Sequence, residues 1–150
     1  MSSVRGLALL GVLLVGALAA CGGSGHPATT TSSTAGAASQ IKANWQSFFS
    51  SKEPDSSKPA LIQNGSRFSS AIEALAKNPL AKNTSAKVSS VKLQGPSKAK
   101  VVYSIYLGST PALKHQTGYA LKQNGTWVIA DASLCSLLQL EGGAPSVCKK

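Results

Sequence analysis

The stretch Tyr119-Ala-Leu-Lys-Gln-Asn-Gly-Thr-Trp-Val-Ile-Ala-Asp-Ala-Ser-Leu-Cys135 decides the fold. At its centre, Asn124-Gly125 separates two β-prone runs. Both central residues of a two-residue type I′ turn need a positive φ, which Asn tolerates and Gly adopts freely. Trp127, Val128 and Ile129 follow with side chains that suit a half-buried pleated surface. The stretch therefore predicts a tight antiparallel hairpin.

The strands before this hairpin follow from alternating apolar side chains. The clearest strand carries four large residues on one face, namely Val101, Tyr103, Ile105 and Leu107. An earlier strand contains Val88, Val91 and Leu93. Its alternation slips near Ser89-Ser90, which predicts a β-bulge at that point.

Three helices are predicted upstream from apolar spacing and from Pro and Gly punctuation. The first has Ser39 as its N-cap and one apolar stripe, made of Ile41, Trp45, Phe48 and Phe49. The second lies between Pro59 and Gly65, where Gly65 takes the C′ position. The third ends at Asn78-Pro79, and its apolar stripe is Phe68, Ile72, Leu75 and Ala76.

Together these segments predict one α+β domain over residues 39–150. Its four antiparallel strands form a meander, with Gly95-Pro96-Ser97 as one turn and a loop over residues 108–112 before the third strand. Residues 134–140 predict a short C-terminal helix, which Gly142-Gly143 ends. We expect the three N-terminal helices to pack on one face of a curved sheet, around either a filled core or a conical cavity.

The N-terminal residues carry targeting signals. Arg5 precedes an apolar run from Gly6 to Ala20, a pattern typical of a signal peptide over residues 1–20; the run is short for a spanning helix, which needs about 20 apolar residues. Its Leu-Ala-Ala-Cys ending resembles a bacterial lipobox, which implies that Cys21 is lipidated and begins the mature protein. Residues 21–38, rich in Gly, Ser, Thr, Ala and Pro, predict a flexible tether.

The two remaining cysteines, Cys135 and Cys148, lie in the exported part of the chain. An oxidising compartment and an even count favour a disulfide between them. A metal site is not expected, because there is no Cys-x-x-Cys pair and His26 and His115 are isolated. No cofactor is expected either.

The net charge of the chain is +10. Its lysines are scattered singly, without the aromatic and basic interleaving of a nucleic-acid-binding platform, so nucleic acid is not an expected partner. Attraction to anionic lipid or cell-wall polymer explains the same charge. The scattered lysines include Lys42, Lys58, Lys77, Lys87, Lys98, Lys114 and Lys122.

Three short motifs carry a family resemblance: Ala60-Leu61-Ile62-Gln63-Asn64-Gly65, Asn124-Gly125-Thr126-Trp127-Val128 and Asp131-Ala132-Ser133-Leu134-Cys135. With the order of elements, they make residues 41–140 similar to the mycobacterial low-molecular-weight secreted antigen family and its lipoprotein relatives. The order also resembles the cone-shaped nuclear-transport-factor-2-like fold. The resemblance implies an envelope or secreted protein, and it offers no family catalytic residue to carry over.

Asp131 is the strongest candidate for proton transfer among five acidic residues. If the alternation of Trp127 and Ile129 continues, Asp131 points to the same face as these side chains and could act as an acid or base in a cavity. The more ordinary interpretation is that Asp131 caps the segment that begins at Ala132. A Gly-x-Ser-x-Gly elbow and a phosphate-binding glycine loop are both absent from the sequence.

These observations favour a non-catalytic, lipid-anchored protein on the outer face of the cell membrane, released in part if the tether is cleaved. Its domain would bind a small apolar ligand or dock another envelope component, with Tyr103, Tyr119, Trp127 and Asp131 lining the cavity. One alternative is a small enzyme of the same fold that uses Asp131. Another is an adhesive module whose basic surface binds anionic lipid or glycan.

Overall fold

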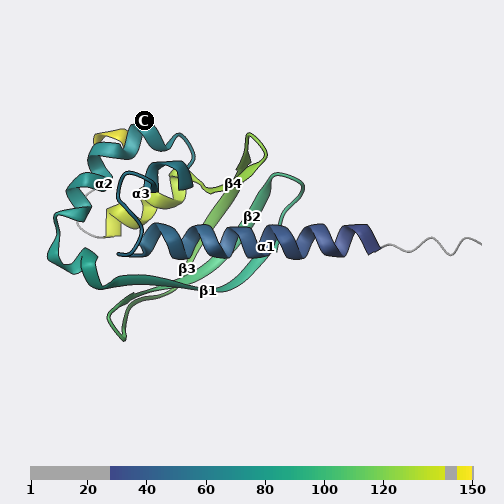
Figure 1. Cartoon of the computed structure of the whole chain (residues 1–150), viewed down its shortest axis with the longest axis horizontal. Helices are drawn as coiled ribbons and strands as arrows, with labels where there is room; N and C mark the ends of the chain where they lie inside the picture. Colours follow the sequence, from purple (N-terminus) through teal and green to yellow (C-terminus); the bar gives the residue numbers. More distant parts are fainter. Residues whose placement is uncertain (1–27, 141–144, 150) are drawn as a thin grey trace, which may run out of the picture.

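The computed structural model describes residues 28–140 and 145–149. The chain forms an α+β domain in which helices pack against a curled sheet (Figure 1). Its helices, with 3₁₀-helices labelled η, and its strands are α1 (Ala28–Phe49), η1 (Lys58–Leu61), η2 (Gly65–Phe68), α2 (Ser69–Ala76), η3 (Pro79–Asn83), β1 (Thr84–Leu93), β2 (Lys98–Leu107), β3 (Thr110–Gln123), β4 (Thr126–Ile129), α3 (Asp131–Leu140) and η4 (Ser146–Cys148).

The sheet is an antiparallel meander in the order β1-β2-β3-β4. The predicted tight turn is confirmed, since Asn124 and Gly125 have φ values of 50° and 82° and Gln123 pairs with Thr126. The predicted bulge in β1 is also confirmed, because the register of β1 against β2 shifts between Val88 and Ser90. These two local features set which side chains face inward.

The core lies between α1 and the inner face of the sheet. α1 crosses the sheet and contacts both β1 and β4, and its predicted stripe is buried or half-buried. Trp45, only 1% exposed, is packed so closely over β3 that a Cβ added at Gly118 would lie 3.0 Å from its ring. Glycine in β3 therefore makes room for the largest side chain of the helix.

The N-terminal helical region differs from the three predicted helices. Residues 28–83 form two α-helices and three short 3₁₀-helices, and α1 begins at Ala28, so the predicted N-cap at Ser39 is wrong. Once the buried stripe has nucleated a helix, each added residue contributes one hydrogen bond, and alanines favour this extension. Residues 28–38 of the predicted tether are therefore helical, and this part of α1 projects beyond the sheet (Figure 1).

The third strand also starts earlier than predicted. β2 and β3 are joined by a turn at Gly108-Ser109, so residues 110–112 belong to β3 and not to a loop. Pro111 is tolerated because β4 pairs only with residues 120–123, which leaves the first half of β3 at an edge of the sheet.

Several predictions concern residues that the structure does not describe. These are the signal peptide, Cys21, the first part of the tether, and Gly142-Gly143. Within the described residues, none of the helices combines the length and the apolar character needed to cross a bilayer.

Candidate functional site

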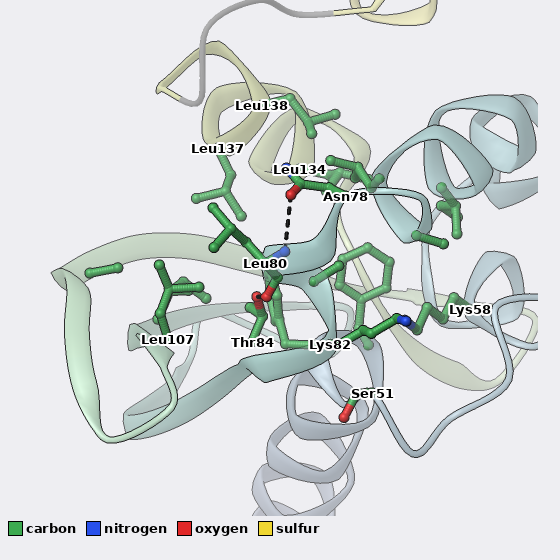
Figure 2. A pocket seen from close by; sticks show the side chains of 18 of the residues that line it. Ser51, Lys58, Asn78, Leu80, Lys82, Thr84, Leu107, Leu134, Leu137 and Leu138 are labelled. Atoms are coloured by element: carbon green, nitrogen blue, oxygen red, sulfur yellow. Dashed lines mark hydrogen bonds between the residues drawn. The ribbon is translucent and has the colours of Figure 1, made fainter.

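A groove of about 590 Å³ opens at the end of the sheet where α2, η3 and α3 meet the last residues of α1 (Figure 2). The ends of β2 and β3 form its floor, with Ile105, Leu107 and Leu113. Its volume lies within the range of about 300–1,000 Å³ that is typical of small-molecule sites. The groove is thus large enough to hold a ligand.

Apolar side chains from four helical segments form the walls. α3 contributes its leucines because a helix that packs on one face presents residues three and four apart to the same side. The apolar wall residues are Phe48, Phe49, Ile72, Leu75, Ala76, Leu80, Ala81, Leu134, Leu137, Leu138 and Leu140. Such a lining favours an apolar guest.

The mouth of the groove is also apolar. Leu80 is 58% exposed and Leu140 is 62% exposed, and these are the exposed large hydrophobic residues of the part that the structure describes. Leu80 is held at the start of η3, because its N–H donates to Asn78 Oδ1 at 3.0 Å (Figure 2). Single exposed leucines are common on protein surfaces, but two of them beside one opening indicate a binding site.

Charged side chains occupy one part of the rim. Lys58 Nζ lies 2.8 Å from Asp55 Oδ1, so these two charges offset one another. Lys82 also lines the groove, and the ion pairs seen among described residues do not include it. In Figure 2, Lys58 and Lys82 lie toward one side, and Leu137 and Leu138 lie toward another. The described residues of the rim therefore carry a net positive charge next to an apolar interior.

The four residues predicted to line a cavity do not line this groove. Tyr103 is part of the core, where its ring centroid lies 5.6 Å from Trp45 and 6.2 Å from Phe49, and burial raises the pKa of its phenol to about 12. Trp127 is 4% exposed, and its carbonyl accepts a hydrogen bond from Asn44 Nδ2. Both aromatic rings fill the core, because removing their apolar surface from water is favourable.

Tyr119 and Asp131 lie elsewhere again. Tyr119 is on the outward face of the sheet, with Lys98 Nζ 4.6 Å from its ring centroid. Asp131 does not extend the alternation of β4, because the strand ends at Ile129 and the chain turns into α3. The prediction that these residues share a cavity with Tyr103 and Trp127 is wrong.

Asp131 instead joins the start of α3 to the segment before η2. Its Oδ1 accepts the N–H of Ala132 at 2.6 Å, and its Oδ2 accepts a hydrogen bond from Asn64 Nδ2 at 3.3 Å. Gln63 N–H donates to the carbonyl of Ile129 at 2.8 Å. Asp131 is thus the first residue of α3 and not a regular N-cap, and its carboxylate lies favourably at the positive end of the helix.

The predicted disulfide between Cys135 and Cys148 is present and ties α3 to η4. His115 is exposed on β3 and does not line the groove. Within the described ranges, His, Cys, Asp and Glu side chains do not gather in a group of three that could hold a metal ion.

Comparison with known proteins gives one family. The model of the family described as low molecular weight antigen MTB12, C-terminal domain, matches residues 34–145. The search of curated proteins finds no match for this chain. The matched range includes every residue of the groove described above.

Proposed function

Because this chain belongs to the family of the low molecular weight antigen MTB12 C-terminal domain, we propose that it is an exported envelope protein whose groove binds a small apolar ligand with an acidic head group. The groove is the observation that carries this proposal. It joins an apolar interior to an open mouth flanked by Leu80 and Leu140. An apolar guest that covers such surfaces removes them from water, which lowers the free energy.

The positive charge of the rim supports the proposal that the ligand has an acidic head group. Asp55 offsets Lys58, whereas Lys82 has no ion-pair partner among the described residues. A carboxylate or phosphate beside Lys82 would offset that charge while its acyl chain lies against the leucines of α3. A fatty acid or a singly acylated phospholipid has this combination of groups.

We also propose that the protein is anchored through a lipid on Cys21 and acts without catalysis. The groove opens at the C-terminal end of α1, and Cys21 precedes the other end of this helix. A helical layer over a curled sheet, open at this end, fits a cone-like arrangement of the kind that the resemblance implies. Asp131 lies outside the groove and is engaged with Ala132 and Asn64, which gives no support to the enzyme hypothesis.

A fluorescent fatty acid, dansyl-undecanoic acid, tests the proposal. The chain from residue 22 to 150 is secreted without its lipid and titrated with the probe. Ala76 lines the groove, and its replacement in Ala76→Phe should fill the space and weaken binding at least about tenfold. The matched control is Ala132→Phe, at an exposed position of α3 that does not line the groove. Equal affinity of the two variants, or no binding by the unmodified chain, would contradict the proposal.

The head-group part has its own test. Lys82→Gln should weaken the dansyl fatty acid roughly two- to fivefold, the range expected for an exposed ion pair. Binding of the corresponding dansyl alcohol should be unchanged, since it has no charge for Lys82 to offset. A similar loss for both probes would show that Lys82 does not recognise the acid.

A further inference from the structure

The outward face of the sheet carries lysines that form no ion pair with the residues that the structure describes. From residue 74 to residue 130 the chain contains eight lysines and neither Asp nor Glu. Strand pairing and alternation place four of these lysines and two tyrosines on the face opposite α1. We call this set the basic face; its members are Lys87, Lys92, Lys98, Lys100, Tyr106 and Tyr119.

Pairing across the strands brings like charges together on this face. Lys92 of β1 is directly opposite Lys100 of β2, which in turn is opposite Tyr119 of β3. Like charges at directly opposite positions destabilise a sheet. A protein that keeps this arrangement, with no acidic residue in the sheet, is suited to a partner that supplies the negative charge.

Two of the four lysines of the basic face lie over aromatic rings. Lys87 Nζ is 4.7 Å from the ring centroid of Tyr106, and Lys98 Nζ is 4.6 Å from that of Tyr119. These contacts orient the ammonium groups without neutralising them. Both tyrosines are half-buried, so each presents an apolar ring and a polar hydroxyl at the surface, which suits the interface between water and lipid.

The basic face is broad and does not line the groove. Lys87, Lys92 and Lys98 are exposed, and α1 packs on the other side of the sheet. Charge spread over two neighbouring strands, β1 and β2, fits an extended anionic surface better than a small ligand.

The position of the chain's N-terminal part favours a bilayer as this surface. The C-terminal end of α1 meets Ile105 and Leu107 at the groove, so the helix starts at the other end of the sheet, toward Lys98. Cys21 precedes Ala28 by seven residues, which span at most about 25 Å. A membrane that held the start of the chain would thus lie within reach of Lys92, Lys98 and Lys100.

We propose that the basic face binds the anionic head groups of a lipid bilayer. Each lysine near such a surface strengthens binding about fivefold, and salt weakens the attraction. This contact would hold the sheet against the membrane and leave the groove at the far end open to its ligand. It does not depend on the groove.

Vesicle flotation tests this proposal with the unlipidated chain from residue 22 to 150, so that the anchor does not determine binding. The vesicles contain phosphatidylcholine alone or with about 30% phosphatidylglycerol, at low and at physiological salt. The double variant Lys92→Glu/Lys100→Glu is compared with Lys52→Glu/Lys77→Glu, which has the same net charge but changes exposed residues off the sheet.

We expect the unmodified chain to bind only the anionic vesicles, and more weakly as salt is raised. The Lys92→Glu/Lys100→Glu variant should bind at least about tenfold more weakly, and the control variant within about threefold of the unmodified chain. Ala76→Phe should bind vesicles normally, which separates this proposal from that of the groove. Equal losses in the two charge variants, or retention by dextran sulfate but not by anionic vesicles, would overturn the proposal.

Discussion

At the scale of single residues, Gly65 has a steric role. A Cβ at this position would lie 1.7 Å from the carbonyl oxygen of Pro59, so any side chain must displace the backbone of η1. Gly65→Ala should therefore lower the free energy of unfolding by roughly 2–3 kcal/mol, measured by urea denaturation. The matched control is Gly36→Ala in α1, where an added Cβ meets nothing and stability should rise by up to about 1 kcal/mol. Equal stability of the two variants would refute this role.

Tyr103 should make the free energy of unfolding depend on pH in the alkaline range. Burial raises its pKa from 10.0 to about 12. Below pH 10 the phenol is neutral in both states and has no effect, whereas between pH 10 and 12 it ionises first in the unfolded chain and favours unfolding. The free energy of unfolding should fall over this interval by about 2–3 kcal/mol, which is two pKa units. Tyr103→Phe keeps the buried ring but has no phenol to ionise, so urea titrations at pH 9 and pH 12 should show a smaller fall in the free energy of unfolding. If the variant and the unmodified chain lose the same free energy, Tyr103 does not cause this pH dependence.

The sequence predicted individual residues well where the cause was local. Asn124-Gly125 and the slip near Ser89 depend on backbone preferences and on the alternation of neighbours, and both were confirmed. Gly65 was predicted for its flexibility as a C′ residue, but Asn64 takes the positive φ and Gly65 avoids a clash with Pro59. Such a contact appears only when the 3₁₀-helices are placed.

At the scale of secondary-structure elements, the disulfide holds η4 against α3. Its cysteines are 13 residues apart, and a closed loop of this size stabilises the fold by about 3 kcal/mol through the lost entropy of the unfolded chain. The double variant Cys135→Ser/Cys148→Ser should lose about 2–3 kcal/mol in chemical denaturation, and reduction of the unmodified chain should cause a similar loss. If neither change alters the midpoint, the disulfide does not stabilise this domain.

The pairing of β1 with β2 predicts that Lys92, which we propose to bind anionic lipid, lowers the stability of the fold. Lys92→Glu replaces a repulsive pair with an attractive one opposite Lys100, so the free energy of unfolding should rise by about 0.5–1 kcal/mol. Thermal melting at low salt measures this gain, which should shrink at high salt. A loss of stability would show that Lys92 makes a favourable contact in the folded chain.

The sequence did not predict the features that depend on contacts between distant elements. The groove combines residues from α1, η1, α2, η3, α3 and three strands, so no local pattern marks it. One interpretation continued the alternation of β4 to Asp131, but the strand ends at Ile129 and the chain turns into α3. The pairs of Lys87 with Tyr106 and Lys98 with Tyr119 are separated by about twenty residues, and strand pairing alone brings them together.

At the scale of the whole molecule, the two proposed surfaces lie at different places on one α+β domain. α1, about 33 Å long, starts at the end of the sheet near Lys98 and ends at the groove. An anchor at the start of the chain and a basic face along the sheet would orient the protein on a membrane. The groove would then open away from the point of attachment, where it could accept a ligand from the surroundings.

Native mass spectrometry of the chain from residue 22 to 150, secreted by a lipid-rich bacterial host, tests the groove most directly. We predict an adduct with the mass of a fatty acid or a singly acylated phospholipid, lost on denaturation and absent from Ala76→Phe but present in Ala132→Phe. A bare protein that also takes up no added fatty acid would contradict the account, and so would an adduct that Ala76→Phe retains.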